Sequence, residues 1–325
     1  MEILGAGGPP DRTDVALAHY LERAGEYLRG ARAEHTWRAY RSDWSDFMAW
    51  CAVHELPGLP AEPATVAAYL VSMVQRGARV STIQRRVSSI AQAHRAGGHE
   101  PPPTADWTVR QVLRGIRREL GSAPAVKSPL LPADLRELLA VLDQGTRRGL
   151  RDRAILLLGF AGAFRRSELV GLDLEDLVER PDGLAVRLRR SKTDPEGRGE
   201  LRGIPFGRRA ETCPVLAVRA WREASGLTSG PLFRGLGRGG ALLEERLSDR
   251  GVARVVQRAA RLAGRHPGQY AGHSLRSGLA TAAAEGGAPS WVIRRQTGHR
   301  SDRMLDRYIR SGRLFVDNAV VYTDL

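Results

Sequence analysis

The 325-residue sequence lacks long hydrophobic runs, and its longest nearly apolar stretch, Ala154 to Phe164, covers 11 residues. A membrane-spanning helix needs about 20 apolar residues, and no basic and apolar signal segment opens the chain. The only two cysteines, Cys51 and Cys213, are far apart, which predicts reduced thiols rather than a disulfide framework. We therefore expect a cytoplasmic protein with no membrane partner.

Lysine is nearly absent as well, because only Lys127 and Lys192 occur among 50 basic residues. The sequence has no phosphate-binding P-loop, no H-E-x-x-H zinc motif and no carboxylate cluster for two metal ions. Gly235, Gly237 and Gly240 fit the pattern G-x-G-x-x-G. No convincing strand precedes them and no ribose-binding acid follows, so we interpret this segment as a loop. These absences predict a protein that uses neither a cofactor nor a metal ion.

Positive charge is what the sequence has in excess, with a formal net charge of +14 and a pI near 10.8. Residues 1–78 carry a net charge of −3, residues 79–120 carry +5 and residues 121–325 carry +12. Such a balance predicts a polyanionic partner, most simply a nucleic acid, whose binding falls steeply with salt. The alternative is a basic surface that binds nothing.

The pattern of apolar residues predicts two domains, residues 1–120 and 133–325, joined by a proline-containing linker over 121–132. Helices are expected in the first domain over 14–28, 36–54, 65–75, 81–95 and 106–119. In the second domain we expect helices over 133–142, 150–164, 214–224, 248–263, 275–285, 290–297 and 302–309. Two alternating runs, 184–190 and 200–206, predict a small antiparallel sheet. The fold class is therefore mainly α with a small antiparallel β-sheet.

Two pairs of residues in the second domain have the spacing of one helical turn. Arg165 and Glu168 lie three residues apart, so they face each other on a turn. His273 and Arg276 have the same spacing at the start of a helix, where free N–H groups also favour an anion. Taken alone, each pair is equally well explained as a surface ion pair or an ordinary histidine.

Three further residues add chemistry to these pairs. His299 precedes Tyr308 by nine residues, and Lys192 lies in the turn between the two predicted strands. A packed histidine and a packed tyrosine are the simpler interpretation of each residue alone. Together, the two arginines, the lysine, the two histidines and the tyrosine can attack a phosphodiester without a metal ion.

These segments resemble the tyrosine recombinase (phage integrase) family over nearly the whole chain. The resemblance rests on Thr82-Ile83-Gln84, His94-Arg95, Gly272-His273-Ser274 with Arg276, His299, and Tyr308-Ile309-Arg310. It implies a site-specific DNA recombinase or integrase that works through a 3′-phosphotyrosine intermediate and a Holliday junction, without metal or ATP. It also implies a C-shaped clamp of two domains, a helical SAM-like core-binding domain and an α+β catalytic domain.

The resemblance also implies roles for single residues. Tyr308 would attack the phosphate, Arg165, Arg276 and His299 would bind it, His273 would act as base and Lys192 would protonate the leaving 5′-oxygen. Glu168 would hold Arg165 or His273 in place. The expected DNA contacts lie on the fourth helix, at Ser81, Thr82, Arg85, Arg86 and Arg95.

The family implies a homotetramer on two DNA duplexes, in which the apolar tail over 314–325 docks on a neighbouring subunit. Packing of that tail onto its own domain is the alternative. Two other functions stay open at this stage. One is a type IB topoisomerase, which relaxes supercoils as a monomer. The other is a DNA-binding protein without catalytic activity.

Overall fold

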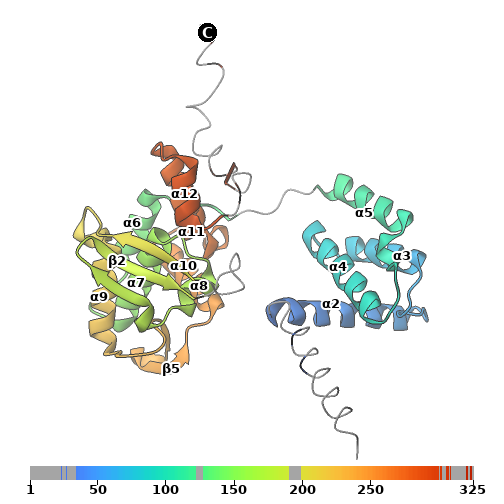
Figure 1. The fold of residues 1–325 in the computed structure, drawn as a ribbon, viewed down its shortest axis with the longest axis horizontal. Helices are drawn as coiled ribbons and strands as arrows, with labels where there is room; N and C mark the ends of the chain where they lie inside the picture. The colour runs from blue at the N-terminus through green and yellow to red at the C-terminus, as the bar shows by residue number, and fades with distance from the viewer. Residues whose placement is uncertain are drawn as a thin grey trace, which may run out of the picture. The chain divides into compact units, whose positions relative to one another are not determined.

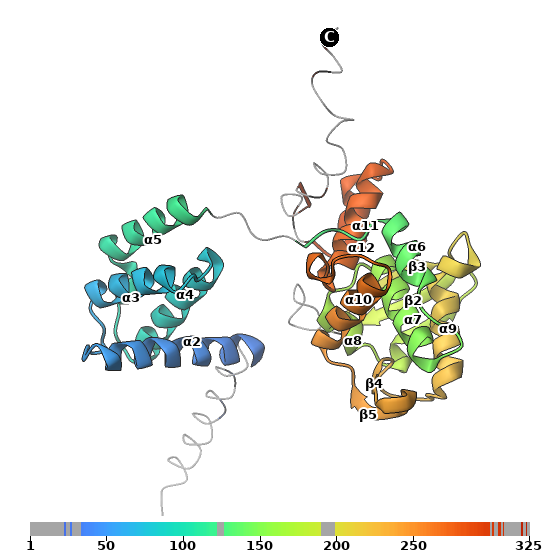
Figure 2. The same cartoon turned by 180° about the vertical axis from the view of Figure 1, so that it is seen from behind.

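The computed structural model describes residues 34–121, 127–189 and 199–299, together with the single residues 23, 27, 301, 305, 306, 308, 320 and 323. The chain divides into two compact units, Met1–Ala125 and Val126–Leu325, which Figures 1 and 2 show from opposite sides. No helix among the described residues is long and apolar enough to cross a membrane.

The first unit is a helical bundle around one apolar core. Its elements are α2 (Glu34–Val53), α3 (Pro63–Gln75), α4 (Val80–Ala96), η1 (Pro103–Ala105) and α5 (Trp107–Leu120). Fully buried Phe47, Tyr69 and Ile83 connect three of these helices. The expected helices are present with ends within two residues of the prediction, and Asp106 caps α5 by accepting from the Thr108 N–H at 2.7 Å. The helix expected over 14–28 lies outside the described ranges.

The second unit packs helices around α7 beside a three-stranded antiparallel sheet of order β1-β2-β3 (Figure 1). Helix α7 contacts both α9 and α11, and the core includes the fully buried Trp221 and Phe233. The larger elements are α6 (Pro132–Ala140), α7 (Arg147–Ala161), α8 (Arg166–Gly171), β1 (Leu177–Arg180), β2 (Gly183–Leu188), β3 (Glu200–Pro205), α9 (Pro214–Ser225), β4 (Arg234–Leu236), β5 (Leu242–Arg246), α10 (Asp249–Leu262), α11 (His273–Glu285) and α12 (Ser290–Thr297). Short 3-10 turns are η2 (Leu174–Asp176), η3 (Ala210–Thr212), η4 (Arg238–Gly240) and η5 (Pro267–Gln269).

Two expectations for this unit need correction. The glycine-rich segment interpreted as a loop forms the β4–β5 hairpin, whose turn accepts hydrogen bonds from Arg147 and Arg148 at the start of α7. Strand β1 was not expected, because three of its four residues are exposed and show no alternation. It forms through its ladder with β2, and such pairing cannot be recognised from one segment alone.

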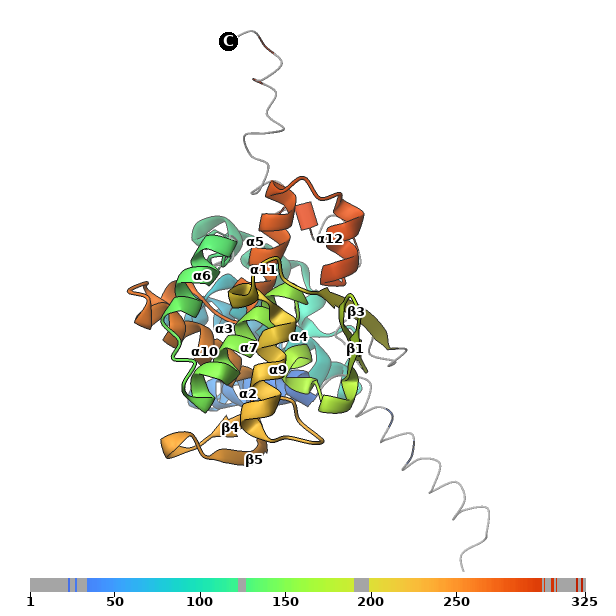
Figure 3. The ribbon, with the colours of Figure 1, turned by 90° about the vertical axis from the view of Figure 1, so that its left-hand side faces the viewer.

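Helices α11 and α12 pack against each other near the C-terminal end of this unit and hold the turn that carries Tyr308. Figure 3 shows α11 and α12 next to each other, and the two helices are in contact. Leu305 is fully buried against Ala280, Ala284 and Ile293 of these helices. Residues 305, 306 and 308 are helical, so Leu305 anchors the turn that carries Tyr308.

Candidate active site

Arg165 and Glu168 form a tight pair at the start of α8. The Arg165 backbone N–H donates to Glu168 Oε2 at 2.8 Å, and the Arg165 guanidinium donates through Nη1 to Oε1 of the same carboxylate. Glu168 is 5% exposed, so its carboxylate is held between two donors rather than by water. The pair fixes both the backbone and the side chain of Arg165.

Arg276 lies on the first turn of α11 and is 2% exposed. Its Nη1 donates to the Ala163 carbonyl at 2.8 Å, whereas its Nη2 has no hydrogen-bond partner within the described part of the chain. Burial, reinforced by the positive charge of Arg165, lowers the pKa of Arg276 to about 10. A buried guanidinium with a free donor is suited to bind an anion.

His273 and Tyr308 meet although they lie 35 residues apart in the sequence. His273 Nε2 is 2.9 Å from the Tyr308 hydroxyl, and the rings of His273 and His299 both lie about 6 Å from the Tyr308 ring. A neutral imidazole nitrogen at this distance can accept the phenol proton. The contact is therefore short enough for a proton to pass from the phenol to the imidazole.

His299 is 8% exposed and follows Gly298, which ends α12 in the left-handed region at φ +63°. Its Nδ1 lies 2.7 Å from Thr297 Oγ1. Burial, followed by the charges of Arg276 and Arg165, lowers the pKa of His299 to about 4. The imidazole is therefore neutral near pH 7, and its contacts depend on which ring nitrogen carries the hydrogen.

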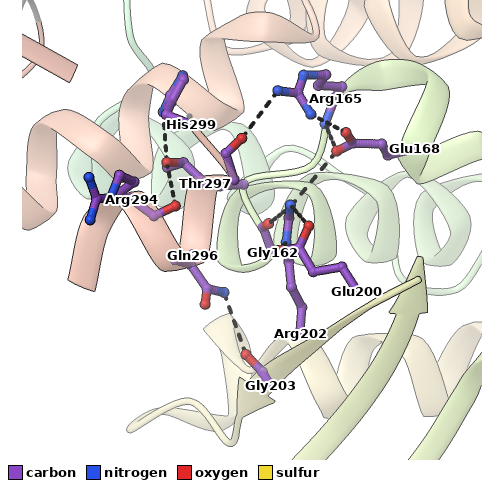
Figure 4. Close-up of polar contacts among 12 residues, drawn as sticks. Gly162, Arg165, Glu168, Glu200, Arg202, Gly203, Arg294, Gln296, Thr297 and His299 are labelled. Atoms are coloured by element: carbon purple, nitrogen blue, oxygen red, sulfur yellow. Dashed lines mark hydrogen bonds and ion pairs between the residues drawn. The ribbon is translucent and has the colours of Figure 1, made fainter. Parts of the chain in front are cut away.

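The structure also brings Arg202, which the sequence analysis did not select, into this site (Figure 4). Arg202 is 2% exposed and lies 3.8 Å from Glu168 Oε2. Its position in β3 could have indicated it, because Arg202 and Ile204 share the inward face of an alternating strand. A charged residue on a buried face needs a partner, and here Glu168 and Glu200 provide it.

Six of the expected site residues thus lie together, although they come from four separate segments of the chain. They are Arg165, Glu168, His273, Arg276, His299 and Tyr308. Lys192 falls outside the described ranges. No group of three His, Cys, Asp or Glu side chains able to hold a metal ion occurs among the residues that the structure describes. The site combines a phenol, two imidazoles and a guanidinium with a free donor, groups whose chemistry suits attack on a phosphodiester.

The residues expected to contact DNA divide into two groups on α4. Ser81, Arg85 and Arg95 are exposed and Thr82 is half-buried, which leaves them open to a ligand. Arg86 differs, because its side chain is only 15% exposed.

Arg86 is held inside the first unit by contacts with α2 and α3. Its Nε lies 3.0 Å from Asp43 Oδ1, and its Nη1 donates to the Tyr69 hydroxyl at 2.7 Å and pairs with Asp46. Arg85 also binds Asp43, at 2.7 Å, but keeps half of its side chain exposed. Arg86 therefore connects the helices of the bundle.

Comparison with protein families gives two matches along the chain. Residues 129–313 match the model described as the phage integrase family, and residues 21–96 match the phage integrase N-terminal SAM-like domain. Together these matches cover parts of both structural units.

Individual relatives agree with this result. An integrase/recombinase XerD homolog from Selenomonas ruminantium is 41% identical over 300 residues, covering 92% of this chain and 88% of that protein. The Cre recombinase of Escherichia phage P1 is 26% identical over 302 residues, covering 87% and 86%. The segment Tyr308-Ile309-Arg310 favours a Cre-like protein, but over the whole chain the XerD homolog is the more similar of these two.

A solved structure shows the same fold. The lambda integrase dimer bound to a COC′ core site aligns with a TM-score of 0.61 at 17% identity, over 94% of this chain and 82% of that one. The likeness concerns the arrangement of helices and strands.

Proposed function

The chain belongs to the phage integrase family of tyrosine recombinases and is a site-specific DNA recombinase, and from this premise we propose that Tyr308 forms the covalent bond to DNA. The observation that carries the proposal is the 2.9 Å contact between the Tyr308 hydroxyl and His273 Nε2, next to the free donor of Arg276. These two observations support a role for Tyr308 as nucleophile, for His273 as base and for Arg276 in binding the phosphate.

Cleavage begins with attack of the Tyr308 oxygen on the scissile phosphorus. A free tyrosine has a pKa of about 10, so His273 takes up the phenol proton as the new P–O bond forms. The bond from phosphorus to the 5′-oxygen breaks, and Lys192 gives that oxygen a proton. The products are a 3′-phosphotyrosine and a free 5′-hydroxyl, and the bond energy is kept for rejoining, so no nucleotide cofactor is consumed.

The phosphate itself is bound by arginines and a histidine. Arg165 and the free Nη2 of Arg276 donate to the non-bridging oxygens, because a planar guanidinium matches the geometry of a phosphate. They also neutralise the additional negative charge of the pentacoordinate transition state. His299 donates a further hydrogen bond, and Glu168 keeps Arg165 in place through its two contacts.

DNA binding is divided between the two units. Residues 1–120 form the core-binding domain, in which α4 enters the major groove with Ser81, Thr82 and Arg85, while Arg95 contacts the backbone. Arg86 supports this face through Asp43 and Tyr69 rather than by reading bases. We infer that the core-binding domain and the catalytic domain, predicted over 133–325, bind DNA as a C-shaped clamp. The catalytic domain begins before residue 133, because Leu130 is fully buried in its core and the Leu130 N–H donates to the Ser274 carbonyl at 2.9 Å. Part of the predicted linker over 121–132 therefore belongs to this domain.

Recombination requires two duplexes, and we infer a homotetramer that holds both. The apolar tail over 314–325 docks on a neighbouring subunit. The reaction takes place in the cytoplasm, where the DNA substrate is found and the cysteines stay reduced.

The proposed function is tested by identifying the DNA to which the protein becomes covalently linked. Purified protein is mixed with nicked fragments of DNA from its own host, and covalent complexes are isolated on a denaturing gel and sequenced. We expect adducts at one recurring sequence, and exchange of flanking DNA between two copies of that sequence on a plasmid.

Each rival function predicts a different result in the same assay. A type IB topoisomerase would relax a supercoiled plasmid without exchanging flanks. A catalytically silent DNA-binding protein would bind but give no adduct, and either outcome would contradict the proposal. Tyr308→Phe serves as the matched control, because it should bind the captured sequence normally and form no adduct.

A further inference from the structure

The turn between α7 and α8 is held by three side chains from three different elements. Its consecutive carbonyls accept one hydrogen bond each: Ala161 from Gln296 Nε2 at 2.7 Å, Gly162 from Arg202 Nη1 at 2.8 Å, and Ala163 from Arg276 Nη1 at 2.8 Å. Gln296 belongs to α12, Arg202 to β3 and Arg276 to α11. This turn leads directly into Arg165, so the three elements together fix the backbone position of Arg165.

The backbone of the turn closes on α7, with the Ala163 N–H donating to the Phe160 carbonyl at 3.0 Å and the Phe164 N–H to the Gly159 carbonyl at 3.2 Å, a pair of bonds that ends many helices. Ala163 has φ +47°, a left-handed conformation that costs free energy for a residue with a Cβ atom. It is also fully buried. A strained conformation persists only where its surroundings enforce it, and here the three side-chain donors add to the backbone hydrogen bonds of the turn.

Arg202 contributes more than its bond to Gly162. Its Nε and Nη2 each lie 3.2 Å from an oxygen of Glu200, and its guanidinium stacks over the Phe164 ring at 5.3 Å. Its Nη1 lies 3.8 Å from Glu168 Oε2, the carboxylate that holds Arg165. One buried side chain therefore supports both the turn and the partner of Arg165.

Arg202 also touches the loop that carries His299. A Cβ atom added to Gly298 would lie 2.8 Å from Arg202 Nη2, so the two are in direct contact. Figure 4 shows Arg202 between the Gly162 turn, Glu168 and the strand that carries Glu200. The charge of Arg202 also contributes to lowering the pKa of His299, after burial and the larger effects of Arg276 and Arg165.

We propose that Arg202 is a positioning residue for the recombination reaction, with Gln296 as a second anchor. The pair holds the turn over 161–164 and Glu168 so that the Arg165 guanidinium faces the scissile phosphate. Arg202 itself, at 2% exposure, touches neither DNA nor the reacting atoms. This inference rests on the proposed function, because it assigns Arg165 to the phosphate.

The test is a double-mutant cycle on single-turnover cleavage of a nicked suicide substrate carrying the captured sequence. Arg202→Met should slow cleavage about 100-fold, as expected when a catalytic group is displaced by about 1 Å. Its Kd for DNA should stay within about threefold of the wild-type value, because Arg202 is shielded from the ligand. Arg165→Ala should be slower still. The cleavage rate of the double variant should match that of Arg165→Ala within about threefold, because the side chain that Arg202 positions is then absent.

A merely structural role predicts a different pattern. The rate losses would then multiply in the double variant, and the Kd for DNA would rise with the loss of folded protein. Either result, or wild-type cleavage by Arg202→Met, would overturn the positioning role. Wild-type protein that forms no adduct would instead overturn the proposed function, so the two failures are distinguishable.

Two further variants complete the design. Gln296→Ala removes the two hydrogen bonds that this half-buried side chain donates, to the Ala161 carbonyl and to the Gly203 carbonyl. It should slow cleavage about tenfold and should likewise add nothing to Arg165→Ala, which keeps the test decisive if Arg202→Met does not fold. Arg151→Met is the matched control, because Arg151 is also a buried arginine that donates to a carbonyl and pairs with a carboxylate. It lies ten residues, about 15 Å along α7, from Ala161, so the folded fraction should cleave at the wild-type rate.

Discussion

The free protein keeps a buried positive charge at Arg276, with one guanidinium nitrogen that lacks a hydrogen-bond partner among the described residues. Arg276 is 2% exposed, and its Nη2 finds no acceptor within the described residues. Its pKa is lowered to about 10, chiefly through burial and then through Arg165. A lowered pKa of a cation means that the native state disfavours the charge, so Arg276 destabilises the DNA-free fold at every pH below about 10.

The size of this penalty follows from the pKa. At about 1.4 kcal/mol per unit, the shift corresponds to about 3 kcal/mol. Arg276→Met removes the charge and keeps an unbranched side chain, but it leaves the buried Ala163 carbonyl without its donor, which costs about 1–3 kcal/mol. We therefore expect the variant to be between equally stable and about 2 kcal/mol more stable, while cleavage is lost.

Urea unfolding of the DNA-free protein, followed by circular dichroism, measures this directly. The matched control is Arg151→Met, because Arg151 is also buried and its pKa is also lowered to about 10. Removing its charge should give the same gain of about 3 kcal/mol, but it also breaks the pair with the buried Asp152, 2.8 Å away, which costs about 3–5 kcal/mol. The Arg234 carbonyl loses its donor as well, at a cost of about 1–3 kcal/mol, so the net loss should be about 1–5 kcal/mol. A loss of more than about 2 kcal/mol in Arg276→Met would refute the reasoning that this charge is held for the phosphate.

Three other predictions concern the reaction and its pH dependence. Cleavage should continue in excess EDTA, because arginines neutralise the phosphate charge; loss of cleavage on chelation and its recovery with Mg²⁺ would contradict this. The native pKa of His299 is about 4, so the unfolded chain binds more protons between pH 4 and about 6.5 and stability should fall as the pH decreases through that range. His299→Gln should give a flatter profile of unfolding free energy against pH, and an unchanged slope would refute the assignment. Lys192→Ala should cleave a substrate with sulfur at the 5′-bridging position at nearly the wild-type rate, because a thiolate leaves without a proton; equal defects on sulfur and oxygen substrates would mean that Lys192 only positions the phosphate.

The sequence was most informative where structure depends on local signals. Helix α12 has the bounds expected for it, Ser290–Thr297, because a glycine ends its apolar period. Helix α7 was expected to continue to residue 164, but it ends at Ala161. The three side chains that donate to the following turn belong to residues 202, 276 and 296. Their contacts with the turn are long-range, so the sequence of the turn alone does not predict them.

The same limit applies to charged side chains. The spacing of Arg165 and Glu168 brings them together within one turn, so local geometry is enough to predict their contact. Arg86 was expected on the DNA-facing side of α4, but Asp43 of α2 holds it inside the bundle. That contact spans 43 residues and depends on how two helices pack, which periodicity along one helix does not reveal.

A covalent bond between Tyr308 and DNA is the step on which the proposed recombination mechanism depends. Covalent complexes formed with the captured sequence can be digested with protease and nuclease, and the peptide that retains a nucleotide identified by mass spectrometry. We predict a single modified peptide carrying the nucleotide on Tyr308, and none from Tyr308→Phe. A nucleotide on Tyr322, which lies outside the described residues, or on any other residue would contradict the assignment.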